Sequence, residues 1–211
     1  MRSPDSSQEP APVAGEPLLV VISGPSGAGK DSVLERLRER GNPAHFTVTA
    51  TTRPQREVKP EDHRFLSFLS EEEFQSLLEE DGLLEHAEVY GYHYGVPKAP
   101  LRQAIADGRD VLVRVDIQGA ATIKKLQPDA VLIFLTASSI EELETRLVAR
   151  GQDDAATMKR RLEAARQELE RQGEFDYVLI NKRGDLDGTV DRVEEILAVE
   201  RGRAGRRTVR I

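Results

Sequence analysis

Residues 18–23, LLVVIS, form a continuously apolar run that leads directly into the glycine-rich sequence GPSGAGK at 24–30. A run without polar alternation is typical of a strand buried on both faces of a sheet. After the glycines, Val33, Leu34 and Leu37 recur at helical spacing. The segment therefore predicts a buried strand, a tight loop and a helix, which is the repeating unit of a parallel α/β sheet.

The same alternation of strand and helix returns in the second half of the chain. Residues 110–116, 130–137 and 177–181 have the composition of further buried strands, and apolar stripes at helical spacing lie between and after them. Ser138 or Ser139 is expected to cap the helix that follows the second of these strands. We therefore predict an α/β fold with a parallel-sheet core flanked by helices.

Composition excludes several classes of protein. The 211 residues include 30 basic and 37 acidic side chains, and the net charge of −7 argues against a general nucleic-acid binder. The absence of cysteine excludes disulfides, thiolate metal sites and a cysteine nucleophile, and it fits a cytoplasmic location. No apolar run approaches the ~18 residues that a membrane span needs.

The glycine-rich loop has the pattern GxxxxGK between a buried strand and a helix, the context in which this motif binds nucleotide phosphates. Glycines let backbone N–H groups turn toward phosphate oxygens, and the helix N-terminus adds its dipole. A lysine at the end of the loop supplies a positive charge to the transferred phosphate. The predicted ATP-binding residues are Gly24, Pro25, Ser26, Gly27, Ala28, Gly29, Lys30, Asp31 and Ser32.

Asp31 departs from the usual motif, which ends in a serine or threonine whose hydroxyl coordinates Mg²⁺. A carboxylate is a hard oxygen ligand, so Asp31 is a candidate Mg²⁺ ligand. In the alternative, Asp31 turns outward as a charge at the helix end, and Ser32 or water serves the metal. The sequence leaves both arrangements open.

Residues 46–98 break the strand–helix rhythm and are expected to form an inserted lobe. Segments FTVTATTR and RFLSFLS alternate like half-exposed strands. Arg53 and Arg56 follow the first of them, and arginine forks suit a phosphate dianion. Glu85 is a candidate for reading a base edge, because one carboxylate can bridge the N1–H and N2–H₂ donors of guanine, a donor pair that adenine lacks.

The order of these motifs resembles that of guanylate kinase over residues 17–200. The matching stretches are GPSGAGK, TTR with the following Arg56, LLEHAEVYGYHYG, VDIQGA and RLVARG with the later KRRL. The resemblance implies transfer of the γ-phosphoryl group of ATP to GMP or dGMP, with Mg²⁺. It also implies a P-loop parallel-sheet core (17–47, 99–145 and 168–200), a GMP-binding lobe (48–98) and a lid (about 146–167).

The resemblance also implies roles for individual residues. Arg53 and Arg56 would hold the GMP phosphate together with the hydroxyl of Tyr94. Glu85 would recognise guanine, with Thr49 and Asp116 assisting. The resemblance further implies three catalytic arginines on the lid side, Arg146, Arg150 and Arg161. It also implies that Asn181 lies near the adenine of ATP.

Three features depart from the family pattern. Besides Asp31, Val96 stands where a serine or threonine is usual, which removes a hydroxyl expected near guanine. No tyrosine occurs in the segment after Arg56, where one usually contacts the phosphate, and only His63 or Phe65 lies near that position. We therefore expect weaker phosphate binding than is usual in the family.

The sequence also has features in common with two alternatives to a guanylate kinase. Lys30-Asp31-Ser32 also resembles ribose 1,5-bisphosphate phosphokinase, but that enzyme would not need a guanine-reading carboxylate. Non-catalytic guanylate-kinase-like binding domains generally have a degraded phosphate loop, whereas this chain keeps its lysine. No nucleic-acid or membrane partner is expected, and the oligomeric state stays open.

The two ends of the chain differ in composition from its centre. Residues 1–16 are rich in proline and serine and are expected to be a disordered leader. Residues 201–211 carry five arginines and no acid. We expect this basic tail to be a solvated extension; the alternatives are that it folds back onto the acidic body or binds a polyanion.

Overall fold

The computed structural model describes residues 16–55, 64–89, 91–149, 155–203 and 209–211. Its core is a five-stranded sheet whose order is β2-β7-β1-β8-β9, with all neighbouring strands parallel. The strands are β1 (Leu19–Ser23), β2 (His45–Phe46), β7 (Val111–Arg114), β8 (Val131–Thr136) and β9 (Tyr177–Ile180). The predicted parallel-sheet core is therefore confirmed.

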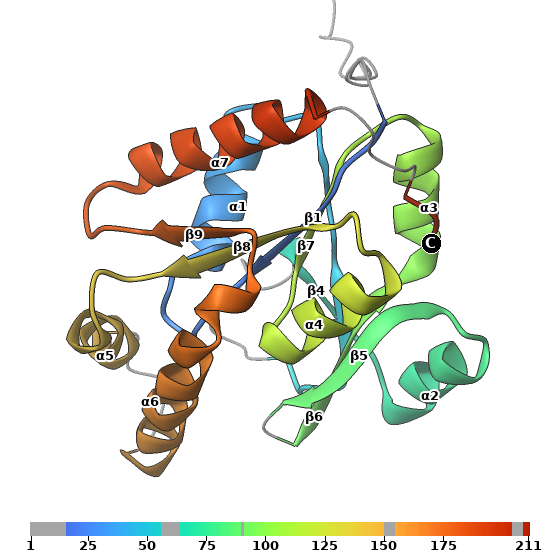
Figure 1. The fold of residues 1–211 in the computed structure, drawn as a ribbon. Coiled ribbons are helices and arrows are strands. Elements are labelled where there is room, and N and C mark those ends of the chain that lie inside the picture. The colour runs from blue at the N-terminus through green and yellow to red at the C-terminus, as the bar shows by residue number, and fades with distance from the viewer. Residues whose placement is uncertain (1–15, 56–63, 90, 150–154, 204–208) are drawn as a thin grey trace, which may run out of the picture.

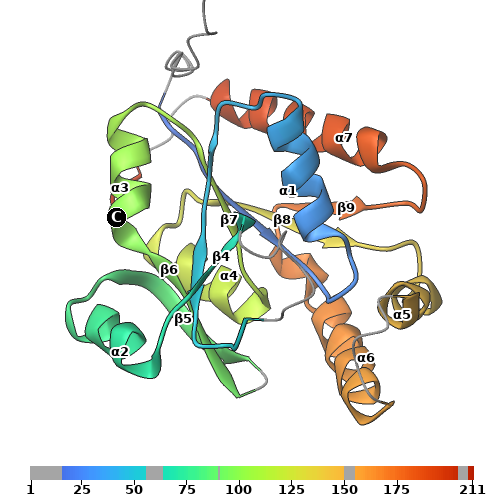
Figure 2. The ribbon, with the colours of Figure 1, turned by 180° about the vertical axis from the view of Figure 1, so that it is seen from behind.

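Helices cover both faces of this sheet (Figures 1 and 2). The alternating side chains of β1 belong to two separate hydrophobic clusters. Val20 and Ile22 pack with α1 (Lys30–Glu39) and α7 (Leu186–Arg201). Leu19 and Val21 pack with α3 (Lys98–Ala106) and α4 (Ile117–Leu126). Burial on both faces explains why this strand is apolar throughout.

A second sheet of four strands, in the order β4-β3-β6-β5, lies beside the core. Its elements are β3 (Thr49–Thr51), β4 (Leu66–Phe68), β5 (Leu83–Val89), β6 (Tyr92–Pro97) and helix α2 (Glu71–Glu79). Ala50, Phe74 and Leu83 form its own small core. The predicted strand FTVTATTR is divided between the sheets, because His45–Phe46 pairs with β7 and Thr49–Thr51 pairs with β4 and β6.

Helices α5 (Ile140–Ala149) and α6 (Ala155–Glu170) lie on the side of the molecule away from α2 in both views (Figures 1 and 2). Ser139 caps α5, since its hydroxyl accepts a hydrogen bond from the Glu142 N–H at 3.2 Å. A 3₁₀ turn, Gln172–Glu174, follows α6. Among the described residues, no helix is both long and apolar enough to cross a membrane.

The end of the basic tail packs against the core, which differs from the expected solvated extension. Val209 is buried in the cluster formed with α3 and α4, and Ile211 packs against the same cluster. The Arg102 Nε donates to the Ile211 carbonyl at 2.7 Å. Apolar burial explains the docking, because the tail ends in valine and isoleucine. The expected leader, up to residue 15, lies outside the described residues.

Candidate active site

The phosphate loop (residues 24–30) joins β1 to α1 and depends on glycine conformations. Gly24, Gly27 and Gly29 all have positive φ angles, of 131°, 89° and 94°. At Gly24 the geometry also excludes a side chain, because a Cβ there would lie 1.9 Å from the Leu135 carbonyl oxygen. Only glycine satisfies both requirements, so the loop can lie close against β8.

Lys30 is the first residue of α1, and its ammonium group folds back over the loop. It donates to the carbonyl of Gly24 and, at 3.1 Å, to that of Pro25. These two carbonyls hold the Lys30 ammonium group next to the loop backbone, whose N–H groups bind phosphates in this motif. Lys30 therefore lies where its sequence position predicted it.

Asn181 and Arg146 bind the backbone of the phosphate loop. Asn181 is buried, and its amide donates to the Ala28 carbonyl at 2.8 Å while its oxygen accepts from the Thr189 hydroxyl. The Arg146 guanidinium donates to the Asn181 carbonyl at 2.6 Å and to the Ala28 carbonyl at 3.3 Å. These contacts connect the loop with β9 and α5 and stabilise its shape. Contact of Asn181 with adenine and of Arg146 with the transferred phosphate stay predictions.

Asp31, in the first turn of α1, forms an ion pair with Arg114 at the end of β7. The distance between Arg114 Nη1 and Asp31 Oδ1 is 2.7 Å. About half of the Asp31 side chain is exposed, whereas that of Arg114 is 18% exposed. The next residue, Ser32, is also exposed. Sequence reasoning missed Arg114, although a charged residue ending an otherwise apolar strand was a visible signal.

Glu85 presents a buried carboxyl group where β5 packs against α4. It lies on β5, is 5% exposed and faces Gly119 in the first turn of α4. A Cβ at Gly119 would lie 2.7 Å from Glu85 Oε2, so this glycine makes room for the carboxyl group. Burial, and secondarily the negative charge of Asp116, raises the pKa of Glu85 to about 8.

Asp116 has a structural role beside its predicted one. Its side chain accepts from the Gly119 N–H at 2.8 Å and caps the N-terminus of α4. The motif VDIQG thus combines a helix cap, a neighbouring charge for Glu85 and the glycine that admits the Glu85 carboxyl. Sequence reasoning found Asp116 but missed Gly119, whose only signal was its place three residues after an aspartate.

The other predicted acceptor residues lie on or just after strands of the second sheet. Thr49 is buried on β3, and its hydroxyl has no hydrogen-bond partner among the described residues. The Arg53 guanidinium lies 5.9 Å from the centre of the Phe68 ring. Tyr94 lies on β6, opposite Thr51 of β3. The arrangement brings a hydroxyl, a cation and a phenol to neighbouring strands.

Glu168 is a site residue that sequence reasoning missed. It lies on α6, and its Oε2 atom is buried without a hydrogen-bond partner among the described residues. Burial, and then the charge of Asp116, raises the pKa of Glu168, and the charge of Lys30 opposes this rise. Glu168 is thus close enough to Lys30, at the phosphate loop, and to Asp116, at the start of α4, for both charges to act on it.

Some predicted residues fall elsewhere or outside the described parts. Arg56, His63 and Arg150 lie outside the described residues. Arg161 is partly buried on α6. Two residues at positions that depart from the usual pattern serve packing instead: Val96 is fully buried beside α3 and α4, and Phe65 is buried in the core with the Arg38 guanidinium 4.9 Å from its ring centre.

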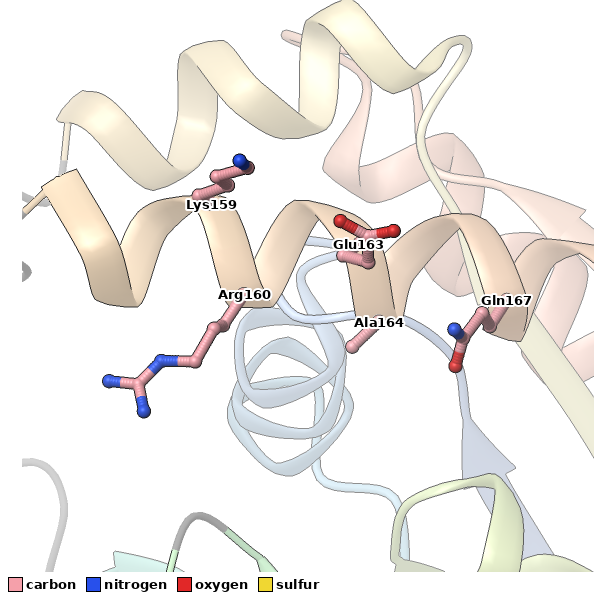
Figure 3. A pocket seen from close by; sticks show the side chains of 5 residues that line it. All are labelled: Lys159, Arg160, Glu163, Ala164 and Gln167. Carbon is pink, nitrogen blue, oxygen red and sulfur yellow. The ribbon is translucent and has the colours of Figure 1, made fainter.

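A pocket of about 280 Å³ lies along α6, and all five side chains that line it come from this helix (Figure 3). Figure 3 shows Lys159 pointing toward α5 and Arg160 pointing away from it. None of the loop or Glu85 residues lines this pocket. It is therefore a surface feature of α6, and the candidate site is defined by the residues around the phosphate loop.

A parallel sheet that carries a glycine loop and its lysine, with a buried carboxyl group on a neighbouring lobe, defines a P-loop nucleotide-binding protein of the kinase type. The guanylate kinase family model matches residues 16–200. Guanylate kinase 2, chloroplastic/mitochondrial, of Oryza sativa is 44% identical over 97% of this chain and 72% of its own length. A guanylate kinase of Synechococcus is 41% identical over 90% of this chain and 86% of its own length.

A solved guanylate kinase from Anaplasma phagocytophilum matches the fold with a TM-score of 0.72 and 30% sequence identity. The match covers 90% of this chain and 89% of that one. The chain belongs to the guanylate kinase family.

Proposed function

We propose that this protein transfers the γ-phosphoryl group of ATP to GMP or dGMP, giving ADP and GDP or dGDP. The observation that carries the proposal is the buried carboxyl of Glu85, which packs against Gly119 in the first turn of α4. A desolvated carboxylate matches the paired N1–H and N2–H₂ donors of guanine. Adenine and the pyrimidines lack this donor pair, so their binding would leave the buried carboxylate charge without matching hydrogen bonds. Membership of the guanylate kinase family supports the same acceptor.

Phosphoryl transfer of this kind requires positioning and charge neutralisation more than covalent chemistry. Lys30 and the loop N–H groups would hold the ATP phosphates. Arg53, Arg56 and Tyr94 would hold the phosphate of GMP. That phosphate is itself the nucleophile and is largely ionised near neutral pH, so no strong general base is needed. Arg150 and Arg161, on the lid side, would stabilise the charge on the transferred group.

The metal expected with ATP is Mg²⁺, and the residues present fit it. The Asp31 carboxylate and the Ser32 hydroxyl are exposed oxygen donors directly after Lys30. Mg²⁺ usually takes one or two protein oxygens and completes its shell with phosphates and water. When bound, the ion would neutralise phosphate charge.

One assay tests the proposed function. The protein is mixed with Mg·ATP and, separately, GMP, AMP, UMP and ribose 1,5-bisphosphate, and ADP release is measured. We expect release with GMP and a loss of about 100-fold or more in kcat for Lys30→Ala. Release with the sugar bisphosphate alone would overturn the proposal. The cytoplasmic location stays a prediction, since one relative is named for chloroplast and mitochondrion.

A further inference from the structure

The residue after the loop lysine is an aspartate, and its carboxylate is already engaged by an arginine from another strand. Arg114 ends β7, which pairs with β1 so that Arg114 lies opposite Ile22, two residues before the phosphate loop. The ion pair joins Arg114 Nη1 to Asp31 Oδ1 at 2.7 Å. Two chain segments 83 residues apart thus meet beside the loop.

The contact leaves part of the carboxylate accessible. Among the described residues, the ion pair uses Oδ1 of Asp31 and one guanidinium nitrogen, and the Asp31 side chain is 52% exposed. The second oxygen can therefore bind a metal ion while Arg114 holds the first. A hydroxyl in this position would be neutral, whereas an aspartate adds a negative charge close to the ATP phosphates.

Arg114 is positioned to cancel this added charge. Its side chain is 18% exposed, and its Nε is buried without a hydrogen-bond partner among the described residues. Leaving a buried donor unsatisfied destabilises a fold. The preceding strand residues Val111, Leu112 and Val113 are all fully buried and apolar, so packing alone does not require an arginine here.

From these contacts we infer that Asp31 is a ligand of the divalent metal of the nucleotide and that Arg114 is its positioning residue. Together, the neutral pair replaces the hydroxyl that usually ends the loop motif. Arg114 would orient one carboxylate oxygen and neutralise the charge, and the other oxygen would be available to the metal. The inference rests on the proposed function for the presence of a metal–nucleotide complex, but not on the identity of the acceptor.

The test measures metal and nucleotide binding in the full chain without any acceptor. Calorimetry gives the Kd of ADP with Mg²⁺ and with EDTA, and electron paramagnetic resonance gives the affinity of Mn²⁺ for the protein–ADP complex. The variants are Asp31→Asn, Arg114→Met and the double variant. Arg192→Met and Glu195→Gln, an exposed ion pair on α7, are matched controls.

We expect Asp31→Asn to lower the Mn²⁺ affinity by about tenfold or more and to leave ADP binding in EDTA no weaker. Arg114→Met should lower the Mn²⁺ affinity by about tenfold, because the carboxylate loses its orientation. It should also weaken ADP binding in EDTA, because the carboxylate then repels the phosphates. The double variant should resemble Asp31→Asn, since Arg114 acts through Asp31.

Two results would overturn the inference. One is a Mn²⁺ affinity of Asp31→Asn within about twofold of the wild type, which would remove Asp31 from the metal. The other is additive effects in the double variant, which would mean that Arg114 acts independently. If Arg114→Met does not fold, Arg114→Lys keeps the charge and is expected to retain ADP binding in EDTA while losing Mn²⁺ affinity. A failed GMP assay with intact metal binding would overturn only the proposed acceptor.

Discussion

Replacing Glu85 with glutamine removes the buried ionisable carboxyl that the proposed acceptor site depends on. The pKa of Glu85 is raised from an ordinary 4.5 to about 8 because the carboxyl is buried and lies near Asp116. Since one pKa unit corresponds to about 1.4 kcal/mol, ionising Glu85 inside the folded protein costs about 5 kcal/mol. Binding of guanine would offset this cost by donating two hydrogen bonds to the carboxylate.

The sign of the effect on stability follows from proton binding. Below a pH of about 4.5, Glu85 is protonated in both the folded and the unfolded chain and makes no difference. As the pH rises toward 8, the unfolded chain has lost this proton while the folded one retains it, so the free energy of unfolding falls. Glu85→Gln has no such proton, so its stability advantage over the wild type should grow to about 3–5 kcal/mol by pH 8.5.

Two measurements check this reasoning. Urea unfolding of wild type and Glu85→Gln at several pH values should give diverging free energies, and parallel curves would refute the buried ionisation. For the wild type, the KM for GMP should fall about eightfold between pH 7 and pH 8.5, in inverse proportion to the ionised fraction of Glu85, which rises about eightfold over that range. The KM for ATP should stay constant over that range, and a KM for GMP that ignores pH would refute a carboxylate reader.

Three further predictions follow from single contacts. Gly119→Ala places a Cβ 2.7 Å from Glu85 Oε2, so we expect the KM for GMP to rise while that for ATP is retained, and steady-state kinetics would test it. Asn181→Ala removes the amide that binds the phosphate loop at the Ala28 carbonyl. It should lower the free energy of unfolding by about 1–3 kcal/mol, as measured by urea titration, and raise the KM for ATP. Asp110→Ala breaks a buried ion pair with Arg201, which is 23% exposed, and a loss of about 2–4 kcal/mol in the same titration is expected. An unchanged midpoint would contradict either stability prediction.

Sequence patterns predicted the elements that have a uniform environment, such as a strand buried on both faces. Residues 18–23 are apolar throughout because both faces of β1 are covered, and that pattern is visible without any structure. The phosphate loop could also be predicted from the sequence. Its positive φ angles admit few residues other than glycine, so the loop geometry leaves a pattern of glycines in the sequence. The sequence did not distinguish the two-residue strand β2 from β3. An apolar–polar alternation predicts a strand, but it does not predict the sheet in which the strand pairs.

The candidate site was predicted less completely than the fold. Glu85 and Asp116 were found from residue type and position, but the effect of Asp116 on the pKa of Glu85 depends on burial and distance. Asn181 and Arg146 were expected at the nucleotide, and in the structure they bind the loop backbone. The sequence did not predict the burial of Glu168, because a glutamate on an amphipathic helix usually faces water. Tertiary packing buries its carboxyl group within range of the Lys30 charge.

The sequence by itself determined the class of this protein. A buried strand, a glycine loop and a lysine at the start of a helix are local features, and short-range sterics and hydrogen bonding specify them. The tertiary structure alone decided which distant groups share the site. Arg114 meets Asp31 because β7 lies beside β1, and Glu85 fits beside α4 because residue 119 lacks a side chain. Charge interactions depend on the distance between groups and on their burial, and both are set by the tertiary structure and cannot be read from the sequence.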